Sequence, residues 1–305
     1  LYSSAASDVY KRQQPMKAPA FISALRLKGP SRSGLWITAV AVLSAQIAIL
    51  SVQFLAPINN LEKKLADIRV AALEVPKPPS DQIIVVALDE DTLAQFTYRS
   101  PIDRAFIASL IERIDTAGAK AIGVDVLIDQ ASDPAKDEQL YSIVRAAKTP
   151  LYFSFTSDSA FVTEPQLEYM RAFVPADKRM ESRLLSDPFD GLVRRINPGG
   201  IVSGDKVTYD DDHPPSFAAV MARYLDARQP EEPREIAWRP LSADGEDPIP
   251  VISANYVPYL PPEIFAGKVV LIGAVLSITD RHPTPLTIID DGDRGLMPGV
   301  LIQAH

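Results

Sequence analysis

Residues 83–88 read IIVVAL, and this short stretch decides the fold class. The run is unbroken in apolar side chains, rich in β-branched residues, and followed directly by carboxylates at 89–91. That pattern is typical of a strand buried on both faces of a sheet, because a strand with one wet face alternates apolar and polar residues. Similar apolar runs at 121–126 and 151–155 predict two more buried strands.

Helical periodicity fills the two intervals between these strands. The first predicted helix begins at Asp103, a suitable N-cap, and ends at Gly118, which suits a helix C-terminus. Asp133 and Pro134 begin the second predicted helix as its N-cap and first-turn pair. The apolar faces of the two helices comprise Phe106, Ile107, Leu110, Ile111 and Ile114, and Leu140, Ile143, Val144 and Ala147. With right-handed crossovers, this order predicts an α/β fold, a mostly parallel sheet with flanking helices.

The rest of the chain is less regular. Residues 161–183 are expected to be an irregular or partly helical insertion, and 190–196 a strand entered from a turn. Ser216 suits the N-cap of a third helix. The Pro-rich, charged segment 229–250 predicts a loop, and KVVLIGA at 268–274 is the last clear strand.

An apolar segment precedes this domain. From Leu35 to Leu55 the sequence LWITAVAVLSAQIAILSVQFL carries no charge. At about 1.5 Å per residue, a helix of this length crosses a hydrocarbon core of about 30 Å. A buried core helix is usually shorter or has a polar side, and a cleaved signal peptide has an apolar run of only about 7–15 residues. We therefore predict an uncleaved transmembrane helix at 35–55.

Residues 1–34 form a leader before this span, and residues 1–13 resemble translated adapter sequence rather than native protein. The basic residues on the two sides of the span nearly balance, so the positive-inside rule does not decide the orientation. We place the leader in the cytoplasm because it is too short to be an obvious folded domain. The main domain, 76–305, is then extracytoplasmic, and it is expected to be truncated at its C-terminal end.

A helical stalk is predicted at 56–75. Its apolar residues repeat at 3-4-3-4 spacing: Ile58, Leu61, Leu65, Ile68 and Ala72. This spacing is that of a short coiled-coil seam, and two heptads are equally compatible with packing against the following domain. As a hypothesis, the seam continues the membrane helix into a homodimer stalk.

Composition limits the chemistry. The 305 residues carry a net charge of -8, which argues against a nucleic-acid partner. The absence of cysteine excludes disulfides, iron–sulfur clusters and thiol catalysis. The histidines His213, His282 and His305 lack the short spacing of a zinc site. There is no phosphate-binding or dinucleotide-binding glycine motif. We expect no catalytic residue, metal or cofactor in this chain.

Ligands of open parallel sheets bind beyond the carboxyl ends of the strands. This rule makes Asp89, Glu90, Arg104, Asp125 and Asp280 the candidate ligand-binding residues for a small ligand or other stimulus. The alternative is structural: the carboxylates cap helices or pair with Arg104 and Arg194.

One motif suggests an enzyme instead. Residues 87–93, ALDEDTL, place Asp89 and Asp91 as D-x-D-x-T after a strand, which is the opening motif of haloacid-dehalogenase-like phosphatases. That family also needs a separate Ser/Thr, a Lys and a later acidic pair for Mg²⁺. Asp290 and Asp291 could fill the last role, but they lie in a Gly-rich turn rather than after a clear strand. The acidic runs 210–212 and 290–293 lack the spacing of an EF-hand, so we expect solvated turns there.

Several pieces in order along the chain resemble the second type of CHASE domain, the sensory extracellular module associated with cyclases and histidine kinases. They are KLADIRV (64–70), IIVVALDEDTL (83–93), SPIDR (100–104), GAKAIGVDVLID (118–129), DPFDGLVRRI (187–196), IFAGKVVLIGA (264–274), TDRHPTPL (279–286) and MPGVLIQAH (297–305). The shared order, together with the N-terminal membrane segment, carries the resemblance. SPIDR lacks the tryptophan expected in an aromatic-rich segment there.

The resemblance implies an extracytoplasmic sensor followed by further membrane helices and a cytoplasmic nucleotide cyclase, histidine kinase or Ser/Thr kinase, none of which the sequence reaches by His305. It implies residence in a bacterial inner membrane and supplies no ligand. The alternatives are the anchored phosphatase and a non-catalytic anchored scaffold that only binds partners.

Overall fold

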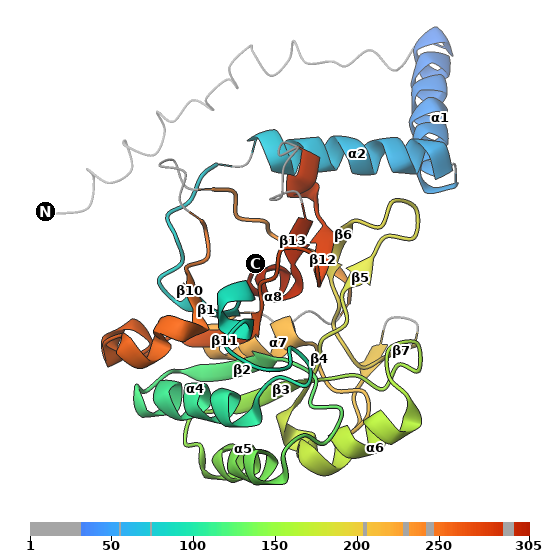
Figure 1. The fold of residues 1–305 in the computed structure, drawn as a ribbon. Coiled ribbons are helices and arrows are strands. Elements are labelled where there is room, and N and C mark those ends of the chain that lie inside the picture. Colours follow the sequence, from blue (N-terminus) through green and yellow to red (C-terminus); the bar gives the residue numbers. More distant parts are fainter. Residues whose placement is uncertain are drawn as a thin grey trace, which may run out of the picture. The chain divides into compact units, whose positions relative to one another are not determined.

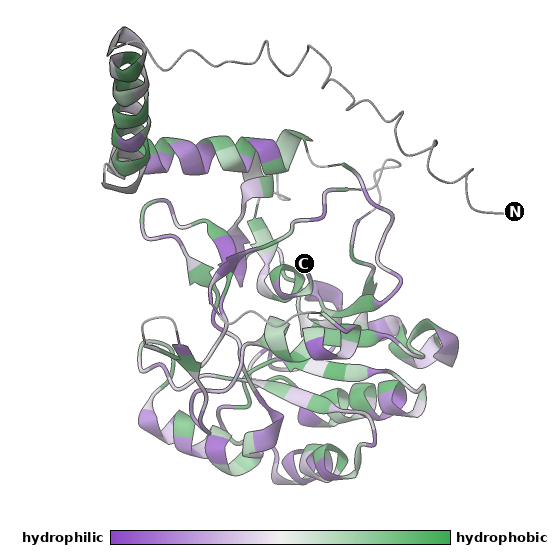
Figure 2. Cartoon of the chain, turned by 180° about the vertical axis from the view of Figure 1, so that it is seen from behind, coloured by the Kyte–Doolittle hydropathy of each residue, from purple (hydrophilic) through white to green (hydrophobic). Residues whose placement is uncertain are grey.

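A computed structural model describes residues 32–54, 56–73, 75–203, 206–227, 232–241, 247–288 and 296–305. The chain divides into two compact units, 1–62 and 63–305, each of which is described by itself. Helix α1 (Arg32–Phe54) belongs to the first unit, and its coloured part is mostly hydrophobic (Figure 2). Among the described residues, it is the one helix long and apolar enough to cross a bilayer. Leu55, the last residue of the predicted span, lies outside the described residues.

The second unit is built on a six-stranded sheet in which every neighbouring pair is parallel. The order is β10-β1-β11-β2-β3-β4. The strands are β1 (Ile83–Leu88), β2 (Ala121–Asp125), β3 (Leu151–Phe155), β4 (Arg179–Glu181), β10 (Val251–Ser253) and β11 (Val269–Ala274). The predicted α/β class with a mostly parallel sheet is confirmed.

Helices cover both faces of this sheet (Figure 1). On β1, Ile84, Val86 and Leu88 point to one face and Val85 to the other, so all are buried. The first face packs on α4 (Arg104–Thr116) and α5 (Pro134–Ala146). The second face packs on α7 (Phe217–Ala222) and α8 (Gly299–Ala304).

The predicted caps of these helices are confirmed. The side chains of Asp103, Asp133 and Ser216 each accept a backbone hydrogen bond from the first turn of their helix. Gly118 follows α4 with a φ of 77°, a left-handed conformation that glycine adopts without a Cβ clash.

Two strands of the main sheet, β4 and β10, were not predicted from the sequence. The segment 161–183 contains helix α6 (Glu164–Phe173), the turn η1 (Ala176–Lys178) and β4, which extends the sheet beyond β3. Strand β4 begins with a buried arginine, Arg179, which gives no apolar signal. Its guanidinium donates to the carbonyls of Val174, Asp211 and Arg171 at 2.8–2.9 Å, and these bonds make its burial tolerable. Strand β10 is only three residues long and pairs with β1.

Smaller sheets follow the main one. Strands β5 (Leu185–Ser186), β6 (Val193–Ile196) and β9 (Arg234–Glu235) form one sheet, β7 (Ile201–Ser203) and β8 (Lys206–Thr208) a second, and β12 (Arg281–Pro283) and β13 (Leu296–Pro298) a third. The short helices are α3 (Glu90–Leu93), η2 (Arg223–Leu225), η3 (Ala254–Tyr259), η4 (Pro262–Ile264) and η5 (Pro285–Ile288). The segment 229–250 was expected to be a loop, but its described part contains β9 and buries Ile236 and Trp238.

Candidate functional site

The first carboxylate at the carboxyl edge of the sheet, Asp89, caps a helix. It directly follows β1, and its Oδ1 accepts hydrogen bonds from the Thr92 amide at 2.8 Å and the Thr92 hydroxyl at 2.6 Å. Burial opposes ionisation of Asp89, but the hydrogen bonds from Thr92 and Ser253 together outweigh it and lower the pKa. The structural alternative therefore holds for this residue, because the carboxylate stabilises the first turn of α3.

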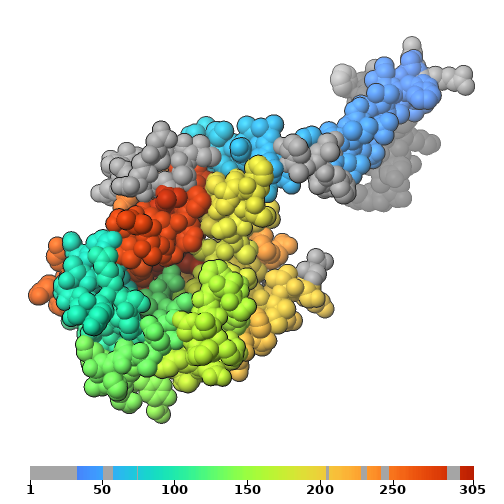
Figure 3. Space-filling view, turned by 45° about the vertical axis from the view of Figure 1, so that its right-hand side comes forward, coloured from blue at the N-terminus to red at the C-terminus, as the bar shows by residue number. Residues whose placement is uncertain are grey.

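Glu90 is held at the surface. The Ser277 hydroxyl donates to its Oε1 at 3.0 Å, and Arg99 forms an ion pair with its Oε2 at 2.8 Å. The Ser277 hydrogen bond and the Arg99 charge lower the pKa of Glu90. The partners come from opposite ends of the domain sequence. Figure 3 shows the late segment, orange-red, beside the turquoise segment that follows β1.

Asp125 and Asp280 are the two predicted residues that the structure brings into electrostatic contact. Asp125 ends β2 and accepts a hydrogen bond from the Ser154 hydroxyl at 2.7 Å. Burial is the main reason why the pKa of Asp125 rises to about 6, and the charge of Asp280 raises it further. His282 Nε2 lies 3.0 Å from Asp280 Oδ1, and its charge opposes this rise. Asp125 is a partly buried carboxyl group that can change charge near neutral pH.

Two glycines allow the backbone to approach this pair of carboxylates closely. A Cβ on Gly273, which faces Asp125 in the sheet, would lie 2.7 Å from Val300 Cβ and 3.1 Å from Asp125 Cβ. A Cβ on Gly299 would lie 2.8 Å from Asp280 Oδ2. The absence of both side chains lets Val300 of α8 lie against the end of β11 and lets the Asp280 carboxylate lie against the first residue of α8.

Arg104, the fifth predicted residue, contacts other residues than these carboxylates. It is 1% exposed, its Nη2 donates to the Gln130 carbonyl at 3.3 Å, and its Nε is 3.8 Å from Asp137 Oδ1. The Nε atom has no hydrogen-bond partner among the described residues. Arg104 pairs with Asp137 on α5, so it ties two helices on one face of the sheet.

The structure describes two of the four residues behind the phosphatase alternative. Asp89 is engaged in the cap of α3, and Asp91 lies inside that helix. Asp290 and Asp291, the candidates for the Mg²⁺ pair, lie outside the described residues, as does the run 290–293. Within the described ranges, no group of three or more His, Asp or Glu side chains could hold a metal ion. The other acidic run, 210–212, is engaged locally, for example by bonds from Arg171 to Asp212 at 2.9 Å.

A second charged region, missed in the sequence, joins β6 to helix α2 (Ala56–Leu73). Arg194 binds Asp67 through Nε–Oδ1 at 2.8 Å and Nη2–Oδ2 at 2.7 Å. It also binds Asp190 through Nη1–Oδ1 at 2.9 Å and Nη2–Oδ2 at 2.7 Å. Asp187 lies 3.3 Å from Arg194 and accepts a bond of 2.6 Å from Lys63. We call these five residues the Arg194 network.

The Arg194 network is largely shielded from water. The side chains of Asp67 and Arg194 are 3% and 10% exposed. The hydrogen bonds that Arg194 donates to Asp67 and Asp190 raise the pKa of Arg194 above its usual value. Asp67 and Asp190 each accept two hydrogen bonds from the Arg194 guanidinium. Such bidentate pairing fixes the angle between α2 and β6 as well as the distance between them.

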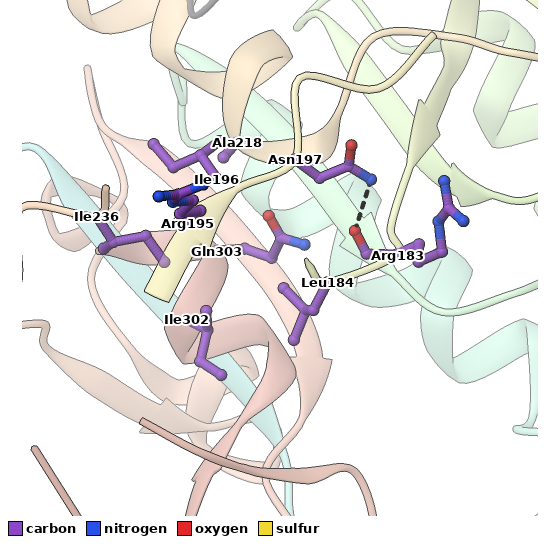
Figure 4. A pocket seen from close by; sticks show the side chains of 9 residues that line it. All are labelled: Arg183, Leu184, Arg195, Ile196, Asn197, Ala218, Ile236, Ile302 and Gln303. Atoms are coloured by element: carbon purple, nitrogen blue, oxygen red, sulfur yellow. Dashed lines mark hydrogen bonds between the residues drawn. The ribbon is translucent and has the colours of Figure 1, made fainter. Parts of the chain in front are cut away.

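An apolar cluster accompanies this network. Val70 of α2 packs with buried side chains from β6, the segment after β9, and α8. We call this set the junction cluster: Val70, Leu184, Val193, Ile196, Ile236, Trp238, Leu286, Met297 and Ile302. A small hollow beside it, with room for about one water molecule, is lined by nine residues that include Asn197, Ile302 and Gln303 (Figure 4). The junction cluster joins α2, which enters the domain, to α8 near the end of this chain.

The residues of the Arg194 network lie in segments that resemble the family, but no motif or periodicity in the sequence indicates that they pair. Asp67 lies in KLADIRV, and Asp187, Asp190 and Arg194 lie in DPFDGLVRRI, two of the pieces that carry the family resemblance. Each piece is by itself compatible with an ordinary solvated, charged segment. Their pairing spans 127 residues and depends on the path of the chain between them.

Comparison with known proteins gives one match. The family model described as "CHASE2 domain" matches residues 38–305. No curated protein and no solved structure matches the chain. Since the family match covers most of the sequence, the predicted resemblance is confirmed: the chain belongs to the CHASE2 domain family, whose members are extracellular sensory domains of signalling receptors.

Proposed function

We propose that this chain is the extracytoplasmic sensory part of a bacterial inner-membrane receptor, anchored by α1, and that it relays a stimulus to a cytoplasmic cyclase or kinase domain of the same receptor. The family is extracellular and sensory, and α1 has the length and composition of a membrane span. The observation that carries the relay is the Arg194 network, because it ties the domain to the helix that begins two residues after α1 ends.

The stimulus acts at the carboxyl edge of the sheet, where Asp125 and Asp280 carry like charges. A ligand or proton that neutralises one of them changes the repulsion between the ends of β2 and β12. The Asp280 carbonyl accepts the Gly299 amide at 3.2 Å, and β12 pairs with β13, which leads into α8. Ile302 of α8 packs in the junction cluster with Val70 of α2. A contiguous set of contacts therefore runs from the edge to the stalk.

The orientation is tested by chemical labelling. The chain has no cysteine, so a single cysteine at the exposed Ser109 is the only reactive thiol. In intact spheroplasts we expect a membrane-impermeant maleimide to label Ser109→Cys fully. A cysteine at exposed Lys120 serves as a second domain position. Labelling of both positions only after lysis would contradict an extracytoplasmic domain.

The relay is tested in the complete receptor by the activity of its own output domain. Asp67→Asn removes one charge from the Arg194 network and keeps the size of the side chain. We expect it to shift the basal output and to abolish the response to changes at Asp125. The matched control is Arg195→Gln, since Arg195 is exposed and lies next to Arg194 on β6. An unchanged response in Asp67→Asn would favour the non-catalytic scaffold instead.

A further inference from the structure

Helix α2 has two faces of opposite character. Lys63, Asp67 and Val70 face the domain, where they join Asp187, Arg194 and the junction cluster. At about 100° per residue, Leu65, Ile68 and Ala72 point in the opposite direction. Leu65 is 52% exposed and Ile68 is 46% exposed. Leu65, Ile68 and Ala72 of the predicted seam therefore point away from the domain, and the ion pairs on the other face hold this part of the helix in that orientation.

Basic residues border the exposed apolar stripe on both sides. On the same helical projection, Lys64 lies beside Ile68 and Arg69 lies beside Leu65. Both side chains are exposed. Long basic side chains at the margins of an apolar stripe are the arrangement of helices that lie in a membrane interface, because their stems cover apolar surface while the charges reach the headgroups.

A second copy of the helix fits the same stripe less well. In a parallel coiled coil with Leu65 at position a and Ile68 at d, Lys64 takes position g and Arg69 the following e position. These positions face each other across a dimer, so the two basic residues would repel. An anionic lipid surface attracts both of them instead.

We propose that α2 lies in the membrane–water interface, with Leu65, Ile68 and Ala72 at the acyl boundary and with Lys64 and Arg69 bound to anionic lipid headgroups. This inference rests on the proposed membrane anchoring by α1, whose last residue precedes α2 by two positions. The Arg194 network then fastens the sensory domain to a helix that is itself in contact with the bilayer. A change in the domain is transmitted as a change in the tilt or depth of α2.

The test uses the full chain reconstituted in vesicles of phosphatidylcholine with roughly 30% phosphatidylglycerol, because an anionic surface attracts basic side chains by about 1 kcal/mol each. A nitroxide is attached to a single cysteine at Ile68, and collisions with oxygen, which concentrates in lipid, are compared with those of a water-soluble nickel complex. We expect Ile68 to favour oxygen by roughly fivefold over the same label at the exposed Ser109 of α4.

The contribution of Lys64 and Arg69 is tested separately. Lys64→Glu with Arg69→Glu should remove most of the oxygen preference at Ile68, since each basic residue contributes roughly fivefold in affinity for an anionic surface. The matched control, Lys120→Glu with Lys148→Glu, makes the same change in net charge at two exposed positions of the sheet domain and should leave the label unaffected. Equal effects of the two pairs would overturn the role of Lys64 and Arg69.

A label at Leu43 in α1 separates this inference from the proposed function. If Leu43 is in lipid and Ile68 is in water, the interfacial helix is overturned and the anchor stands. If Leu43 is in water, the anchor itself is overturned. If Ile68 is protected from both reagents and shows spin–spin broadening between copies, the stripe is covered by a second chain, and the homodimer stalk replaces the lipid surface.

Discussion

At the carboxyl edge of the sheet, Asp125 lies under the influence of Asp280 with a serine hydroxyl as its hydrogen-bond donor. At the stalk, Asp67 and Asp190 are both bound by one guanidinium, and Lys63 binds Asp187. The first arrangement gives Asp125 no arginine or lysine partner: Asp280 raises its pKa, and His282, 3.0 Å from Asp280, lowers it. The second pairs its carboxylates with an arginine and a lysine. Acidic residues in one domain thus differ in how readily they change charge, according to whether a permanent cation is bonded to them.

Removing the built-in cation should have the largest effect. Arg194→Ala leaves Asp67 buried without its partner, and we expect a loss of about 3–5 kcal/mol in the free energy of unfolding. Urea unfolding in detergent, followed by the fluorescence of buried Trp238, measures it. Arg195→Ala, on the same strand but exposed, should change stability by less than about 0.5 kcal/mol. Similar losses of unfolding free energy in Arg194→Ala and Arg195→Ala would contradict a special role of the Arg194 network in stability.

At the edge, removing a charge should stabilise the domain. Burial and Asp280 raise the pKa of Asp125 from 3.8 to about 6. Between these values the folded state holds a proton that the unfolded state releases, so this residue makes stability fall as the pH rises from about 4 to about 6. Asp125→Asn keeps an acceptor for Ser154 and cannot ionise. At pH 8 the variant should be more stable than the wild type by about 1–3 kcal/mol.

The measurement is the unfolding free energy of both proteins at pH 4 and pH 8. The gain in the variant should vanish near pH 4, because Asp125 is then largely protonated in the folded wild type and a neutral amide in its place offers no advantage. An equal difference at both pH values would mean that Asp125 does not titrate in this range. The edge would then be as insensitive to protons as the Arg194 network.

The smallest expected effect is the difference in stability between variants of Asp89 and of Glu90. Asp89→Ala removes the cap of α3 and should cost about 1 kcal/mol in unfolding free energy. Glu90→Gln at the surface should cost less than Asp89→Ala, because water screens the ion pair between Glu90 and Arg99. Asp89→Asn retains the cap and should leave phosphate-ester hydrolysis by the purified chain at its background level. Mg²⁺-dependent hydrolysis that disappears in Asp89→Asn would restore the phosphatase interpretation.

Much of the fold was predictable because it depends on neighbours in the sequence. The strands at 83–88 and 151–155 and the caps at Asp103, Asp133 and Ser216 were placed from apolar runs and from cap residues next to amphipathic segments. Strand β4 was missed because its first residue is a buried arginine, Arg179, whose guanidinium binds the carbonyls of Val174, five residues away, and of Asp211, 32 residues away. The insertion of β11 between β1 and β2 was likewise invisible, since strand order leaves no local pattern.

The candidate site divides in the same way. The rule for parallel sheets led to Asp125 and Asp280 but gave no indication that Ser154 and His282 are their partners. Asp89 satisfied the same rule and is a helix cap. Arg194 was named only as a partner for the carboxylates of the sheet edge, whereas it pairs with Asp67, Asp187 and Asp190. This network was missed because each of its segments is compatible by itself with a solvated turn or helix face.

The sequence by itself determined the apolar helix near the N-terminus, the α/β class, the caps of the main helices and the family, since periodicity, capping and ordered motifs are recorded residue by residue. Only the tertiary structure decided which charges meet: Asp125 with Asp280, Arg104 with Asp137, and Asp67 with Arg194 across 127 residues. The physical reason is that the state of a charged side chain depends on its desolvation and its nearest counter-charge, and both are set by the packing of distant segments.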